Sequence, residues 1–266
     1  MPFTLSHAVA VLPLTRGGRL VPAALVIGAW VPDLPYFVPG LGHSAWTHGA
    51  TGPVSIDLVL GLLVLALWQQ VLRRPLVDLS PAWLRDRLPP PRRLTGRSLG
   101  WAALSVVLGA LTHVVWDTFS HPRRWGTTHV PVLTELRGGL PLYKWFQFGS
   151  GVLGLAGLAV WVALWARRTR PRPGASPLRA PLRLAAWLGA TVVFLVAGTA
   201  SAWSRLHAGA GIESAAVGFA TASMGTTAAA VVLLCLGWPL LGPAGSGRRL
   251  RQAGGVGEGP AQRRQR

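Results

Sequence analysis

The sequence predicts an all-α protein, a polytopic membrane helix bundle with about five transmembrane helices and an N-terminal helical hairpin. Half of the 266 residues are hydrophobic, only 13% are charged, and the mean hydropathy is +0.41. Soluble proteins carry roughly 25% charged residues and cannot easily hide so much apolar surface. Trp101, Trp203 and Trp238 flank apolar runs, as residues at a membrane surface do. We therefore assign residues 1–241 to a single integral membrane domain.

Residues 1–38 are predicted to form the hairpin. Two apolar stretches, 6–14 and 20–30, are too short to cross a bilayer alone, because a span needs about 17–25 residues. Residues 15–19, with two glycines and two arginines, form a turn signal between them. Since the ends of a hairpin return to the same side, we expect His7 to lie near Asp33.

Five later runs are long and apolar enough to span a bilayer, and they make the 53–241 transmembrane bundle. The last of them is rich in glycine and alanine, which allows close helix packing. The runs cover residues 53–72, 99–119, 150–166, 184–203 and 215–241.

The loops between these runs differ in charge, which predicts the topology. Residues 73–97 hold seven arginines, residues 167–183 hold six, and the basic tail 242–266 holds six more. Because basic loops stay in the cytoplasm, we place these three segments inside, with a cytoplasmic C-terminus. The tail is expected to be disordered.

The net charge of +18 is also typical of nucleic-acid binders. The arginines are scattered around the apolar runs, however, and the sequence has no nucleic-acid-binding motif, so we expect no nucleic-acid partner. The single cysteine, Cys235, excludes an internal disulfide and a cysteine-based zinc site. The N-terminus lacks a basic segment and a cleavage site, so no removable signal peptide is expected.

The most informative motif ends the second run, Leu111-Thr-His113-Val-Val-Trp-Asp117-Thr-Phe-Ser-His121. Its His113, Asp117 and His121 are four residues apart and therefore share one face of a helix. Ionisable side chains within a membrane span are costly and usually functional. The alternative is a hydrogen-bonded link between helices.

Further polar groups lie at the same outer rim on the predicted topology. The hairpin supplies His7 and Asp33, the first outer loop supplies His43 and His48, and Asp57 opens the next helix. Taken singly, each has an ordinary interpretation as a cap, turn or loop residue. The prediction of a site depends on their clustering.

Neutral imidazole and carboxylate are the usual protein ligands of zinc, manganese and iron. We therefore predict a divalent metal site, with zinc or manganese expected, holding one ion or two about 3.5–4 Å apart. Either Asp33 or Asp117 would be a ligand or the catalytic general base. The predicted ligands are His7, Asp33, His48, His113 and Asp117, with His43, Asp57 and His121 as second-tier candidates.

These residues, in this order, resemble a family of bacterial membrane proteins catalogued as domain of unknown function 4184. The resemblance covers roughly residues 1–240 and implies a bacterial inner-membrane location, but it supplies no mechanism. It rests on Met1-Pro-Phe-Thr-Leu-Ser-His7, Pro32-Asp33-Leu-Pro, Thr47-His48-Gly, the motif ending at His121, His129-Val-Pro-Val-Leu, and Pro141-Leu-Tyr-Lys-Trp-Phe-Gln-Phe-Gly-Ser150.

The chain is more distantly similar to inner-membrane proteins described as metal-dependent hydrolases. Their pattern is an early His, a Pro-Asp, a Thr-His-Ser and a later His-x-x-x-Asp, and Gly49 stands here where the serine would be. The similarity implies water attack on an ester or phosphoester at the membrane surface, with a membrane lipid as partner or substrate. Arg123, Arg124 and Lys144 would attract an anionic headgroup. The matching positions are His7, Asp33, His48, His113 and Asp117.

Two other functions compete with this hypothesis. A non-enzymatic membrane protein would use the same cluster only to join helices. A transporter would place ionisable groups near the bilayer midplane and often contains an internal repeat. Here the groups lie at the ends of the spans and the sequence shows no repeat, so the transporter ranks third.

Overall fold

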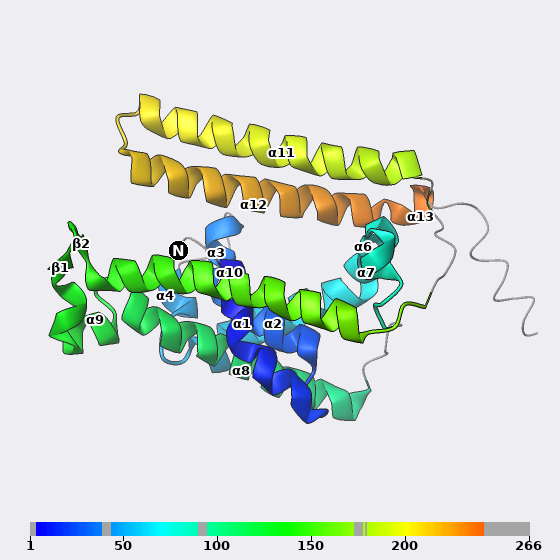
Figure 1. Cartoon of the computed structure of the whole chain (residues 1–266), viewed down its shortest axis with the longest axis horizontal. Helices are drawn as coiled ribbons and strands as arrows, with labels where there is room; N and C mark the ends of the chain where they lie inside the picture. Colours follow the sequence, from blue (N-terminus) through cyan, green and yellow to red (C-terminus); the bar gives the residue numbers. More distant parts are fainter. Residues whose placement is uncertain (1–3, 39–43, 90–94, 173–177, 179, 242–266) are drawn as a thin grey trace, which may run out of the picture.

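The computed structural model describes residues 4–38, 44–89, 95–172, 178 and 180–241 (Figure 1). In this part of the chain almost every regular element is a helix, which confirms the all-α prediction. Five described helices are long and apolar enough to cross a membrane, as expected of a multi-pass membrane protein. They are Ile56–Leu79, Ser98–His129, Leu142–Arg168, Ala180–His207 and Ile212–Leu236.

The N-terminal segment folds as a short helical hairpin. The 3-10 turn Thr4–His7, helix α1 (Ala8–Val11) and the 3-10 turn Leu12–Gly17 form its first arm. The chain reverses at Gly18, whose φ of 72° is a conformation that glycine adopts without strain. Helix α2 (Pro22–Trp30) forms the second arm and packs on α1. This reversal brings the end of α2 back towards His7.

Helix α2 crosses α8 (Gly96–Ser120) with the two backbones in contact. A Cβ atom at Gly28 would overlap the carbonyl group of Val106, and one at Gly109 would overlap the carbonyl oxygen of Leu25. Glycine allows this approach because it carries no side chain, as in many membrane helix pairs. The crossing fixes the register between α8, which carries His113, and α2, which leads directly into the turn that carries Asp33.

Two short elements and a longer helix follow α2. Asp33 ends the 3-10 turn Val31–Asp33, which leads into α3 (Leu34–Phe37). Helix α4 (Ser44–Thr47) carries His48 at its end, and the turn Gly52–Val54 precedes α5 (Ile56–Leu67).

The first predicted span ends later than expected. A π-helical turn, Trp68–Leu72, joins α5 to α6 (Arg73–Leu79), so the helical path reaches Leu79 instead of residue 72. The π turn ends three residues before Pro75, which has no N–H to donate the usual i→i−4 hydrogen bond. The wider turn lets the helix continue past the proline. Helix α7 (Ala82–Arg85) follows.

The segment after α8 is structured, although hydropathy indicates only a connection between two spans there. It contains α9 (Trp125–His129), the 3-10 turn Pro131–Thr134 and a small antiparallel hairpin of β1 (Leu136–Arg137) and β2 (Leu140–Pro141). Gly138 and Gly139 form the two-residue turn with φ of 58° and 82°, which is the turn that tight hairpins favour.

Helix α10 (Leu142–Arg168) begins eight residues before the predicted start at residue 150, because its first two turns are too polar and aromatic to raise the hydropathy. Helices α11 (Ala180–His207) and α12 (Ile212–Leu236) then run side by side, and α13 (Trp238–Leu241) ends the described chain. In Figure 1 this yellow and orange pair lies on one side of α3, with α8 and α10 on the other. The predicted tail 242–266 lies outside the described residues.

Candidate metal centre

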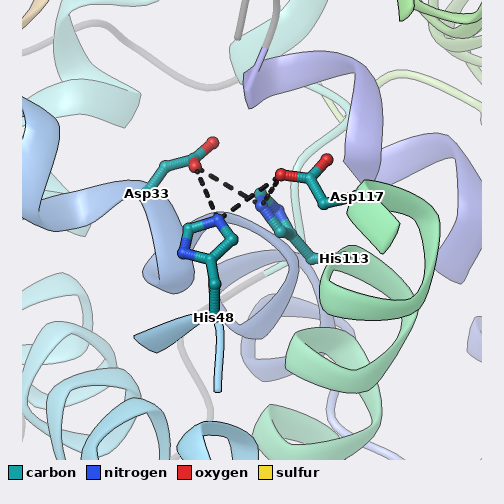
Figure 2. A group of neighbouring side chains, drawn as sticks. All are labelled: Asp33, His48, His113 and Asp117. Carbon is teal, nitrogen blue, oxygen red and sulfur yellow. Dashed lines mark ion pairs between the residues drawn. The ribbon is translucent and has the colours of Figure 1, made fainter. Parts of the chain in front are cut away.

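Four side chains from three separate segments converge at the end of α2 (Figure 2). Helix α8 presents His113 and Asp117 from successive turns, as their spacing of four predicts. Asp33 comes from the turn that follows α2, and His48 comes from the end of α4. All four side chains are buried.

The nitrogen and oxygen atoms of this cluster are evenly spaced. The Nε2 atom of His48 lies 3.4 Å from both Asp33 Oδ1 and Asp117 Oδ2. The Nε2 atom of His113 lies 3.4 Å from the same oxygen of Asp33 and 3.5 Å from that of Asp117. One ligand atom from each residue lies within 4.8 Å of the other three. Both imidazoles therefore face both carboxylates.

Hydrogen bonds behind the two imidazoles determine which nitrogen faces the cluster. The Nδ1 atom of His113 lies 2.8 Å from the carbonyl oxygen of Ala29, and that of His48 lies 3.0 Å from the carbonyl oxygen of Ser44. A carbonyl oxygen only accepts, so each Nδ1 carries a proton and donates. The neutral form of each ring then presents an Nε2 lone pair to the cluster, which is how metal-binding histidines are usually held.

Some buried polar atoms of the cluster have no hydrogen-bond partner, although they lie at ion-pair distance from one another. Both carboxylate oxygens of Asp33 and the Nε2 atom of His113 are inaccessible to solvent and form no hydrogen bond. An unpaired buried polar atom costs about 1–3 kcal/mol, and more when it is charged. A divalent cation at the centre would satisfy these atoms, so the residues present fit a metal.

His7 and His121 adjoin the cluster without joining its four-ligand group. The ring of His7 stacks on that of His113 with 3.9 Å between centroids, and its Nε2 atom lies 3.6 Å from Asp117 Oδ1. The Nδ1 atom of His121 lies 3.5 Å from Asp117 Oδ2. The sequence predicts that His7 lies near Asp33. The contacts of His7 are with Asp117 and His113, and His113 in turn contacts Asp33.

Of the other two second-tier candidates, Asp57 and His43, the structure describes only Asp57. Asp57, in the first turn of α5, is fully buried with no hydrogen-bond partner for either carboxylate oxygen, and it is not a member of the four-ligand group. His43 lies outside the described residues, so its predicted role stays a prediction.

The charge state of the cluster follows from burial and from the pairing of unlike groups. Burial lowers the pKa of His7 to about 4, helped by the nearby His113. Burial alone would raise the pKa of Asp33, but His113 and His48 hold it well below its usual range. Burial likewise opposes the charging of His48, whose pKa is nevertheless raised by its contacts with Asp117 and Asp33. The two carboxylates therefore favour the protonated form of His48, against the effect of burial.

One polar residue of this region, Gln147 of α10, is not among the predicted site residues. Its side chain is buried, and its Nε2 atom donates to the Nε2 atom of His121 at 2.8 Å. Gln147 is the single amide side chain in a helix of 27 residues, and that isolation is the signal that identifies it.

Comparisons with known proteins supply a family and no activity. The sequence model of the family described as Domain of unknown function (DUF4184) matches residues 1–238. No curated protein and no solved structure matches the chain. The four-ligand group lies entirely within the matched region.

Proposed function

The chain belongs to the family described as a domain of unknown function (DUF4184), which carries no known activity. From the geometry of the site, we propose that the protein is a metal-dependent hydrolase. The proposed substrate is an ester or phosphoester at the surface of a bacterial inner membrane. The proposed ligands of one divalent ion, zinc or manganese, are Asp33, His48, His113 and Asp117. His7 and His121 stand beside them, close to Asp117.

The observation that carries the proposal is the spacing of the four side chains. Hydrogen bonds between nitrogen and oxygen measure about 2.7–3.2 Å, whereas the four contacts here measure 3.4–3.5 Å. Two ligands each about 2.0–2.1 Å from a tetrahedral zinc ion lie roughly 3.3–3.4 Å apart. A cluster that only joined helices would gain from closing the gap to hydrogen-bond distance, and this one leaves room for an ion.

The set of donors suits zinc or manganese. Two neutral imidazoles and two carboxylates carry a charge of −2, which a divalent ion neutralises, and neither metal requires a thiolate. Hydrolysis needs a further coordination position for water beside these four ligands. When bound, such a metal lowers the pKa of a coordinated water towards about 7. Hydrolysis then joins the water oxygen to the acyl carbon or phosphorus, breaks the ester bond, and sends a water proton to the leaving oxygen.

The remaining polar groups have roles that follow from their positions. Asp117 contacts both His7 and His121 besides the two ligand histidines, so its carboxylate can accept a proton and pass it on. The guanidinium of Arg124 donates to the backbone carbonyl oxygen of His48 at 3.4 Å, which places a cation next to the cluster. That cation favours a substrate with a negatively charged headgroup.

The test is the metal content of the full chain purified in detergent. We expect close to one equivalent of zinc or manganese by elemental analysis. The double variant His113→Ala/Asp117→Ala should lose it while the helical circular dichroism is kept. The matched control is His129→Ala/Glu135→Ala, which removes an exposed histidine and an exposed carboxylate and should retain the metal.

Two results would contradict the proposal. Wild-type protein without metal, even after dialysis against zinc or manganese, would leave the cluster as a structural link between helices. Equal metal content in the double variant and its control would place the ion elsewhere.

A further inference from the structure

A groove of about 440 Å³ lies beside the metal centre, between the N-terminal arm, α8 and α10. Its size is in the range of roughly 300–1,000 Å³ that is typical of ligand sites. Its walls come from His7, Val9 and Ala10 on one side, and from Trp116, Trp145 and Phe146 with the small residues of α10 on the other.

The lining of the groove is apolar because its polar groups are already paired. The indole N–H of Trp116 donates to the hydroxyl of Ser150, and the indole N–H of Trp145 donates to the carbonyl oxygen of Arg137. The rings of Trp116 and Phe146 stack with 4.9 Å between centroids. What remains exposed along the walls is aromatic and aliphatic surface.

The groove ends at the metal centre. His7 is the one titratable side chain among its described lining residues, and the Nε2 atom of His7 lies 3.6 Å from Asp117. At the other side the groove is open, since Leu153 of α10 is 73% exposed. Both α8 and α10 belong to candidate membrane spans, so this open side faces hydrocarbon when the protein is in a bilayer.

We infer that the groove binds one acyl chain of a bilayer lipid and holds the headgroup of that lipid at the metal centre. This inference rests on the proposed function, whose substrate class it narrows from any ester or phosphoester to one carried by a lipid. An apolar wall that opens to the bilayer and ends at a buried polar cluster matches a molecule with a long apolar tail and a polar head.

The test uses Gly149, which lines the groove on α10. A Cβ atom there would meet no other atom within 4 Å, so a larger side chain projects into open space without moving the backbone. Gly149→Phe should therefore fill the groove. Gly100→Phe is the matched control, because Gly100 is also exposed, lies on spanning helix α8 and has no neighbour within 4 Å, but it does not line the groove.

The probe is phosphatidylglycerol with a diazirine in one acyl chain, added in low molar ratio to full-length protein in detergent. After illumination, mass spectrometry should find the adduct on Val9 and Ala10 in the wild type. We expect labelling there to fall at least fivefold in Gly149→Phe, to fall less in Gly149→Ala, and to stay within twofold in Gly100→Phe. Excess unlabelled phosphatidylglycerol should compete with the probe.

Equal labelling of Val9 and Ala10 in wild type and Gly149→Phe would overturn the inference. So would a change of oligomeric mass in Gly149→Phe without a change of labelling, since the groove would then hold a second copy of the chain. If Gly149→Phe lowers the melting temperature, Gly149→Val replaces it. Metal content is measured in the same samples, so a metal-free protein whose groove is labelled would contradict the hydrolase and leave the lipid groove standing.

Discussion

The imidazole of His113 donates its Nδ1–H to the backbone carbonyl oxygen of Ala29 at 2.8 Å, across 84 residues of sequence. Ala29 lies in the last turn of α2, four residues before Asp33. One hydrogen bond therefore orients the Nε2 atom of His113 and also fixes where α2 delivers Asp33. The packing of α2 on α8 and the placement of Asp33 and His113 therefore depend on the same contact.

The hydroxyl of Thr47 has an equivalent task for His48. It donates to the carbonyl oxygen of Pro32 at 2.6 Å and lies 3.1 Å from the Nδ1 atom of His48. Thr47→Val keeps the shape but removes both contacts, so Asp33 and His48 lose a common support. We expect zinc affinity to fall about tenfold or more, the usual effect of losing a partner behind a metal ligand.

The measurement for Thr47→Val is a competition titration of zinc against a chelator in detergent. Thr199→Val is the control, because the hydroxyl of Thr199 donates only within its own helix, to the carbonyl oxygens of Leu195 and Val196. Affinities that differ by less than twofold between the two variants would mean that Thr47 does not support the ligands.

Metal binding should weaken as the pH falls, because protons compete with the metal for the nitrogen atom of His48. Contacts with Asp117 and Asp33 raise the pKa of His48 despite its burial, so a metal that binds its Nε2 atom competes with a proton up to a higher pH than it would at an ordinary histidine. Affinity should fall about tenfold per pH unit for each proton that the metal displaces. Burial lowers the pKa of His7 to about 4, so His7 stays neutral and adds no slope above pH 5.

Calorimetry in buffers of different ionisation enthalpy counts the protons released on zinc binding. We expect zinc binding to release more protons at pH 6 than at pH 9 in the wild type, with the same difference in His7→Asn. Proton release that did not increase towards low pH would contradict His48 as a ligand.

The sequence predicts most of the cluster because its strongest signals are local. The spacing of His113 and Asp117 places both on one helix face whatever the rest of the chain does. The approach of His7 and Asp33 follows from a turn at residues 15–19 between two short apolar arms, and the structure has that reversal at Gly18. In each case the prediction uses only a short stretch of sequence: a spacing of four residues in the first and a turn between two apolar segments in the second.

What the sequence could not predict depends on local helix geometry that hydropathy does not register and on contacts between distant segments. The length of the first span depends on a π turn before Pro75, and hydropathy does not register such a turn. The early start of α10 is hidden because Lys144 and Gln147 lower the local hydropathy. Gln147 becomes interesting only when α10 is seen to pack beside His121. The separation of four ligands from their neighbours His7 and His121 likewise needs coordinates.

Gln147 fixes the tautomer of His121. Its amide N–H donates to the Nε2 atom of the imidazole, which must accept, so the Nδ1 atom carries the proton that faces Asp117. Gln147→Leu removes that donor. Because the Asp117 carboxylate still faces Nδ1, we expect part of the His121 population to move to the Nε2-protonated form. The loss of zinc affinity should be less than tenfold, because His121 lies outside the four-ligand group.

Nitrogen NMR of the full chain with labelled histidine reports this tautomer directly. Gln70→Leu is the control, since Gln70 is exposed in the π turn and touches no histidine of the cluster. An unchanged His121 signal in Gln147→Leu would mean that another group sets the tautomer.

Close contact of α2 with α8 should make Gly109 sensitive to the smallest possible substitution. A Cβ atom at Gly109 would overlap the carbonyl oxygen of Leu25 and press on Gly28 and Ala29, which are backbone atoms that cannot rotate away. We expect Gly109→Ala to destabilise the protein by about 1–3 kcal/mol, the usual cost of overpacking. Because Ala29 is displaced, its hydrogen bond to His113 should lengthen and zinc affinity should fall as well.

Gly100→Ala adds the same methyl group as Gly109→Ala but should not lower the free energy of unfolding. Gly100 lies on the same helix with no neighbour within 4 Å, so the added methyl group meets nothing and only removes backbone freedom from the unfolded chain. We expect Gly100→Ala to be neutral or to stabilise by up to about 1 kcal/mol, with unchanged zinc affinity. Reversible unfolding in mixed detergent measures both variants. Equal shifts at the two glycines would mean that the α2–α8 crossing does not position His113, and the coupling between this crossing and the metal centre would then be wrong.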